Sequence, residues 1–115
     1  MRILVVEDEK KLASFIKRGL KEKGYAVDVA SNGNDGLFQA KEVPYDLVIL
    51  DIMLPDVSGI EILKAIKASK GLPVIMLSGK NSPQDLELAK AQGADDFAPK
   101  PFKEDELVEK IKALL

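Results

Sequence analysis

The feature that most constrains the fold is a repeated alternation of short apolar runs with segments of helical periodicity. Residues 2–6 (RILVV), 46–50 (DLVIL) and 73–77 (PVIML) are nearly continuous apolar runs, which is typical of strands buried on both faces of a parallel sheet. Residues 25–30 (YAVDVA) alternate and residues 95–98 (DDFA) are few, so both fit the edges of the sheet.

A helix is expected after each strand. The apolar positions predicted for the buried faces are Leu12, Phe15, Ile16 and Leu20 (ended by Gly24); Leu37, Ala40 and Val43; Ile62, Leu63 and Ile66; and Leu107, Val108, Ile111, Leu114 and Leu115. The fourth helix is expected near residues 85–92, where the apolar residues share no single stripe. Strands alternating with helices predict one α/β domain over residues 1–115, a doubly wound, flavodoxin-like (βα)5 fold. Its five parallel strands should run in the order 2-1-3-4-5.

The composition excludes several kinds of function. The 17 basic and 19 acidic residues give a net charge of −2 without a basic block, so direct nucleic-acid binding is not expected. No apolar run approaches a membrane span, and the chain has no cysteine, which suits a cytoplasmic protein. Without histidine or cysteine, the usual zinc sites and Ser-His-Asp triads are excluded, and a metal here must prefer oxygen.

Acidic residues follow the first and third strands. Glu7 and Asp8 end the first strand and Asp51 ends the third, and these ends meet at the switch point, where ligands bind in such sheets. Carboxylates this close repel one another unless a cation binds between them. An all-oxygen cluster suits Mg²⁺, with Asp8 and Asp51 as direct ligands and Glu7 acting partly through water.

The neighbouring strands add a hydroxyl and an ammonium. The fourth strand ends in Ser78, and Lys100 follows the fifth. A metal, a lysine and a hydroxyl around one aspartate would neutralise a phosphoryl group during its transfer. Asp51, central among these groups, is the best candidate for a nucleophile that forms an acyl phosphate.

Each of these residues alone has an ordinary structural explanation. A carboxylate can favour a helix dipole or cap a turn, and a lysine is usually a solvated surface charge. Two other classes of protein also place their sites at such strand ends. A phosphatase of the haloacid-dehalogenase type needs a second aspartate two residues after the first, where this chain has Met53. A flavodoxin-like flavin carrier needs a phosphate-binding loop after the first strand, where residues 7–11 (EDEKK) would repel phosphate. The convergence of the charged residues on one end of the sheet favours phosphoryl transfer.

Four stretches together, VVEDE, DLVILDIMLPDVSG, PVIMLSGK and GADDFAPKPF, resemble the receiver domain of two-component response regulators over the whole chain. The resemblance implies a sensor histidine kinase as partner and Asp51 as the phosphoacceptor. It also implies a magnesium site formed by Glu7, Asp8, Asp51 and the backbone carbonyl of Met53. The receiver would catalyse only its own phosphorylation and dephosphorylation.

The same resemblance implies a conformational switch. Ser78 and Lys100 would contact the phosphoryl oxygens, and Phe97 would be the switch aromatic that turns inward with Ser78. The Lys100–Pro101 peptide would be cis. Lys80 and Met53 would flank the water that hydrolyses the acyl phosphate.

The first half of the chain resembles receivers attached to winged-helix DNA-binding output domains. This implies an output domain, or a homodimer through the fourth helix, fifth strand and last helix, although Glu87 and Lys90 stand where we expect core residues. A receiver fold used only as a structural, designed or chimeric scaffold is the alternative. The basic residues of the first helix are expected to be solvated, with kinase docking as the minority interpretation: Lys10, Lys11, Lys17, Lys21 and Lys23.

Overall fold

The computed structural model of the protein describes residues 1–79 and 83–115. Strands and helices alternate along the chain in the order β1 (Arg2–Val6), α1 (Lys10–Glu22), β2 (Ala26–Ala30), α2 (Gly33–Glu42), β3 (Leu47–Asp51), α3 (Gly59–Ser69), β4 (Val74–Ser78), α4 (Pro83–Ala91), β5 (Asp96–Pro99) and α5 (Glu104–Leu114). Within the described residues, no helix has both the length and the apolar character needed to cross a membrane.

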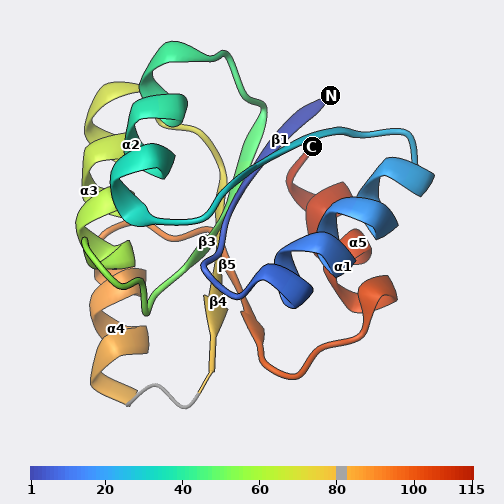
Figure 1. The fold of residues 1–115 in the computed structure, drawn as a ribbon. Helices are drawn as coiled ribbons and strands as arrows, with labels where there is room; N and C mark the ends of the chain where they lie inside the picture. Colours follow the sequence, from blue (N-terminus) through green and yellow to red (C-terminus); the bar gives the residue numbers. More distant parts are fainter. Residues whose placement is uncertain (80–82) are drawn as a thin grey trace.

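The strands form one parallel sheet in the order β2-β1-β3-β4-β5, which confirms the predicted topology. The chain leaves β1 to add β2 on one side and β3 on the other, so the switch point lies between β1 and β3. In Figure 1, β1, β3, β4 and β5 run downward, so their carboxyl ends lie below both chain termini, which are marked in the upper part of the view.

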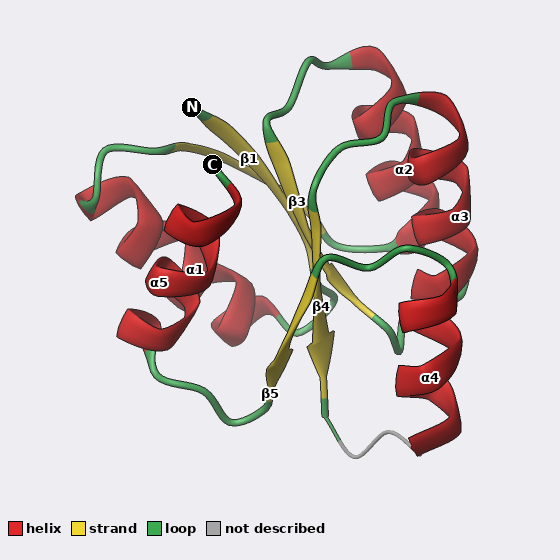
Figure 2. Ribbon diagram, turned by 180° about the vertical axis from the view of Figure 1, so that it is seen from behind, coloured by secondary structure: helices red, strands yellow, loops and turns green. Residues whose placement is uncertain are grey.

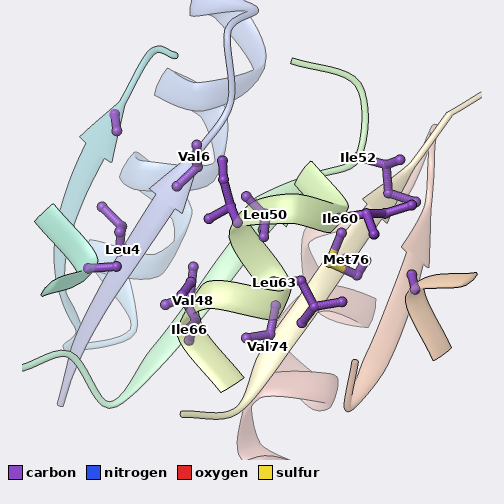
Figure 3. Packing of buried hydrophobic residues seen from close by; sticks show 14 of the residues in the cluster. Leu4, Val6, Val48, Leu50, Ile52, Ile60, Leu63, Ile66, Val74 and Met76 are labelled. Carbon is purple, nitrogen blue, oxygen red and sulfur yellow. The ribbon is translucent and has the colours of Figure 1, made fainter. Parts of the chain in front are cut away.

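Helices cover both faces of the sheet. Figures 1 and 2 show α1 and α5 on one face and α2, α3 and α4 on the other. Successive side chains of a strand point to opposite faces, so β1 contributes Leu4 and Val6 to one apolar cluster and Ile3 and Val5 to the other. Figure 3 shows the cluster under α2–α4, where Leu63 and Ile66 of α3 pack among the strand residues.

Two apolar residues expected in the core are exposed. Phe15 is 38% exposed because the buried stripe of α1 runs instead through Ala13, Ile16, Gly19 and Leu20. Leu115 is 41% exposed because α5 ends one residue earlier. Small residues in the α1 stripe let α5 approach so closely that a Cβ on Gly19 would lie 2.3 Å from Glu104 Cδ. The helical spacing alone does not distinguish this stripe from its neighbour.

The prediction that Glu87 and Lys90 occupy core positions of α4 is wrong. Both side chains are exposed, and Ala89 is the buried residue of the helix. Leu86 packs partly against the core, whereas Leu88 faces solvent. The helix therefore contacts the sheet through a narrow line, which explains why its sequence shows no clear apolar stripe. The basic residues of α1 expected to be solvated are exposed or, for Lys17, half-buried.

Candidate functional site

The polar residues singled out in the sequence meet at the carboxyl ends of the strands. Asp51 closes β3 and Ser78 closes β4, while Glu7 directly follows β1 and Lys100 directly follows β5. The register of the sheet aligns these ends, because Asp51 pairs with Leu77, the residue before Ser78. Parallel pairing alone thus gathers four residues that are distant in the chain.

Lys100 bridges the two buried carboxylates. Its Nζ atom lies 2.7 Å from Glu7 Oε1 and 3.0 Å from Asp51 Oδ2. Glu7 and Asp51 are only 1% and 4% exposed. Burial on its own would lower the pKa of Lys100, but its hydrogen bonds to Glu7 and Asp51 and their negative charges outweigh burial and raise that pKa. The ammonium is therefore held charged at the phosphoacceptor candidate.

Three carboxylates at this site could hold a metal ion. One oxygen each of Glu7, Asp8 and Asp51 can be chosen so that all three lie within 4.8 Å of one another. With the Lys100 ammonium, these four side chains carry a formal charge of −2 (−3 + 1). Oxygen donors, an exposed Asp8 and an uncompensated double negative charge fit a hard divalent cation such as Mg²⁺.

Backbone groups orient the buried carboxylates. The Glu9 N–H donates to Glu7 Oε2 at 3.0 Å, and the Met53 N–H donates to Asp51 Oδ1 at 3.2 Å. Each carboxylate thus accepts one hydrogen bond from the loop after its own strand and one from Lys100. The Met53 side chain, two residues after Asp51 in this loop, is 67% exposed.

Gly59 brings the start of α3 against the end of β3. A Cβ at this position would lie 2.1 Å from the Asp51 carbonyl oxygen, a distance that no side chain tolerates. The Gly59 N–H also donates to the Ile52 carbonyl at 3.0 Å. This close approach, which only glycine permits, therefore sets the position of the Asp51 backbone.

The ends of β4 and β5 are joined beside the acidic residues. Ser78 is buried, and its carbonyl accepts a 2.6 Å hydrogen bond from the Lys100 N–H. The Lys100–Pro101 peptide is cis, as the resemblance implied. Phe97 is half-buried and packs against the apolar cluster under α2–α4. Lys80, expected to flank the water's approach, lies outside the described residues.

Asp56 has a role that its sequence context did not predict. Its carboxylate accepts hydrogen bonds from the backbone N–H groups of Gly33 and Asn34, at 2.7 and 2.9 Å. The contact joins the β3–α3 loop to the start of α2, across more than twenty residues of chain. An aspartate after a proline suggests only a turn, so no local signal reveals its distant partners.

This chain resembles known proteins of one family. The chain matches the family described as the response regulator receiver domain over residues 3–112. It is 42% identical to the transcriptional regulatory protein CusR of Escherichia coli (strain K12) over 116 residues, which cover 100% of this chain and 51% of that protein. It is 47% identical to the transcriptional regulatory protein DltR of Streptococcus agalactiae serotype III (strain NEM316) over 113 residues, or 97% of this chain and 50% of that protein.

A solved structure of a receiver domain has the same fold as this chain. The fold matches that of a response regulator receiver domain protein (CheY-like) from Methanospirillum hungatei JF-1 with a TM-score of 0.93 and 34% identity, covering 97% of this chain and 90% of that one. The chain spans about half the length of the curated relatives it matches.

Proposed function

The chain belongs to the response regulator receiver domain family, and we propose that it accepts a phosphoryl group on Asp51 from the phosphohistidine of a sensor histidine kinase. One observation carries the proposal: the Lys100 ammonium contacts Asp51 and Glu7 together, beside a cluster of three carboxylates. A buried nucleophilic carboxylate, a fixed cation and a site for a divalent ion are the parts that phosphoryl transfer requires.

In the transfer step, an Asp51 carboxylate oxygen forms a bond to phosphorus as the phosphorus–nitrogen bond of phosphohistidine breaks. The bonding electron pair leaves with the imidazole nitrogen, which takes up a proton. Lys100 neutralises charge on the phosphoryl oxygens, and the Ser78 hydroxyl donates a hydrogen bond to one of them. Glu7, Asp8, Asp51 and the Met53 carbonyl would hold Mg²⁺, which would supply further charge neutralisation at the phosphoryl group.

A separate reaction, hydrolysis of the acyl phosphate, resets the switch. Water attacks phosphorus opposite the Asp51 oxygen, the phosphorus–oxygen bond to Asp51 breaks, and the carboxylate is restored with release of inorganic phosphate. The exposed Met53 side chain borders this approach and tunes the rate, together with Lys80. On this proposal the protein catalyses only its own phosphorylation and dephosphorylation.

The phosphoryl group also switches the conformation of one face. Ser78 is buried at the end of β4, and Phe97 lies on the adjacent strand, where it pairs with Met76. A charge on Asp51 draws the Ser78 hydroxyl inward, and the vacated space lets the half-buried Phe97 turn inward. The face formed by α4, β5 and α5 then presents a different surface.

The partners follow from the family and from the lengths of the relatives. We propose that a cytoplasmic sensor kinase supplies the phosphoryl group. The changed face acts on an output domain or on a second copy of the receiver. The transcriptional regulatory relatives are about twice as long as this chain, which supports an output domain that binds DNA, while the receiver itself contacts no nucleic acid.

The test is incubation with Mg²⁺ and acetyl phosphate, followed by intact mass measurement and peptide mapping. We expect one phosphoryl group, located on Asp51. Asp51→Asn should take up none, whereas Asp105→Asn, which changes an exposed carboxylate on α5, should be labelled like the wild type. Labelling of Asp51→Asn at the wild-type rate would refute the assignment.

A further inference from the structure

The loop between β3 and α3 is held by contacts at both ends and at one point between them. At its start, the Met53 N–H donates to Asp51 Oδ1. At its end, the Gly59 N–H donates to the Ile52 carbonyl. Between these points, Asp56 reaches out of the loop to the start of α2, which packs beside α3 on the same face of the sheet in Figures 1 and 2.

The contact of Asp56 with α2 is close and specific. Each carboxylate oxygen accepts a different backbone N–H, Oδ1 from Gly33 and Oδ2 from Asn34. A Cβ on Gly33 would lie 2.9 Å from Asp56 Oδ1 and 3.0 Å from the Val57 carbonyl oxygen, so the loop lies directly against the helix start. The Asn34 hydrogen bond, aided by that of Gly33, lowers the pKa of Asp56 against the opposing effect of burial.

Capping of α2 does not by itself account for this contact. Asn32 already caps the helix, since its Oδ1 accepts from the Asp35 N–H at 2.8 Å and its Nδ2 donates to Asp35 Oδ2 at 3.0 Å. Asp56 satisfies the two preceding N–H groups from another segment of the chain. The arrangement therefore uses the start of α2 as an anchor for the β3–α3 loop.

We propose that Asp56 is a positioning residue for the phosphoacceptor site: its contact with Gly33 and Asn34 fixes the loop that carries Met53, and so fixes the groups that bind Mg²⁺ beside Asp51. This inference rests on the proposed function, because it assigns Asp56 a part in building that site. Outer contacts of this kind orient the groups that bind a metal, and losing one weakens binding without removing a ligand.

The experiment compares Asp56→Ala with Asp35→Ala. Both variants remove an exposed carboxylate that contacts the first turn of α2, but Asp56 belongs to the β3–α3 loop whereas Asp35 belongs to α2 and contacts Asn32. Nuclear magnetic resonance on the metal-free proteins reports the amide exchange of Met53 and Gly59, whose N–H groups donate to Asp51 and Ile52 and not to Asp56. Titration reports the dissociation constant for Mg²⁺. We expect Asp56→Ala to exchange these amides faster and to bind Mg²⁺ about tenfold more weakly, the lower end of the loss for such contacts.

Asp35→Ala should leave both measurements unchanged, and Asp56→Asn, which keeps one acceptor oxygen, should fall between Asp56→Ala and the wild type. Equal Mg²⁺ binding by Asp56→Ala and the wild type, or an equal loss in both alanine variants, would overturn the inference alone. Absence of Mg²⁺ binding and of phosphorylation in the wild type would instead overturn the proposed function. The amide exchange of the metal-free variants would still decide whether Asp56 holds the loop.

Discussion

Lys100 donates to Glu7 across 93 positions of sequence, with Nζ 2.7 Å from Oε1. The same ammonium is the cation that the structure places against Asp51, and the Glu7 side chain is fully buried. We predict that Lys100→Met lowers the free energy of unfolding of the metal-free protein by about 3 kcal/mol, because it leaves buried carboxylates without their cation. Urea unfolding measures the change.

The same variant should bind Mg²⁺ more tightly. The ammonium and a divalent ion compete for the same carboxylates, and a unit charge within about 5 Å of a divalent ion costs on the order of 1–2 kcal/mol even in water. We therefore expect the dissociation constant for Mg²⁺ to fall about tenfold. Lys110→Met is the control, because its 3.4 Å pair with Asp96 is partly exposed and remote from the cluster. Weaker Mg²⁺ binding by Lys100→Met would contradict competition between the two cations.

Gly59→Ala should damage the site through the backbone. The added Cβ would lie 2.1 Å from the Asp51 carbonyl oxygen and 2.8 Å from Ile52 Cα, so the end of β3 or the start of α3 must move. We expect a loss of about 3 kcal/mol in unfolding free energy, the upper part of the range for overpacking, together with slower phosphorylation by acetyl phosphate.

The control for Gly59→Ala is Gly71→Ala. Gly71 has φ of 64° and a Cβ there would meet nothing within 4 Å, so alanine costs only about 1 kcal/mol of backbone strain. Its phosphorylation rate should equal that of the wild type. If Gly59→Ala were as stable and as reactive as Gly71→Ala, the close packing would have no functional consequence.

Much of this site was predictable because a strand end is visible in the sequence. Asp51 and Ser78 each close an apolar run, and parallel pairing brings such ends together whatever the loops do. The predicted strand order placed Lys100 at the same end of the sheet as the carboxylates, but not its pairing with Glu7, because β3 and β4 lie between β1 and β5. Asp56 could not be found in this way, because its partners are backbone N–H groups at the start of α2, which nearly any residue type can supply.

The errors in the predicted core have a common cause. Periodicity identifies a helix but not how closely it packs, and in α1 the small residues Ala13 and Gly19 form the contact while Phe15 faces solvent. In α4 the contact is a single line around Ala89, so the residues beside it carry no pattern. A hydrophobic stripe assumes that large side chains mark the whole interface, whereas α1 buries Ala13 and Gly19 beside Ile16 and Leu20, and α4 buries Ala89.

We expect the hydroxyl of Tyr45 to make the free energy of unfolding depend on pH. Its hydroxyl donates to Asp28 Oδ2 at 2.7 Å, and this hydrogen bond, followed by those from Arg2, lowers the pKa of Asp28. Tyr45→Phe should therefore cost about 1 kcal/mol at pH 7. Because the folded-state pKa is lowered, the stabilisation is present above the unfolded-state pKa of about 3.9 and is lost as pH falls through the folded value.

Urea unfolding at pH 7 and at pH values below about 4 should thus show the difference between Tyr45→Phe and the wild type shrinking with acid. Tyr25→Phe removes a phenol hydroxyl elsewhere and should change the pH 7 stability by less than about 0.5 kcal/mol. A difference that is constant from pH 7 to strongly acidic conditions would show that the hydroxyl stabilises the fold without acting through the Asp28 carboxylate.

Asp8→Asn should stabilise the metal-free protein while weakening its metal site. Asp8 is exposed, and an oxygen of its carboxylate lies within 4.8 Å of oxygens of Glu7 and Asp51, which are buried and share one ammonium. Removing one of three like charges relieves repulsion, for which we expect a gain of about 1 kcal/mol in unfolding free energy without Mg²⁺. The same change removes a proposed ligand, so Mg²⁺ should bind at least about tenfold more weakly.

Thermal unfolding with and without Mg²⁺ separates the two effects of Asp8→Asn. Mg²⁺ should raise the melting temperature of the wild type more than that of the variant, because at a given Mg²⁺ concentration an ion that binds more tightly stabilises the folded state more. Glu9→Gln is the matched control, since it neutralises the next exposed carboxylate, which is not part of the cluster. Lower stability of metal-free Asp8→Asn would contradict this prediction. It would mean that Asp8 stabilises the fold by more than its repulsion from Glu7 and Asp51 destabilises it.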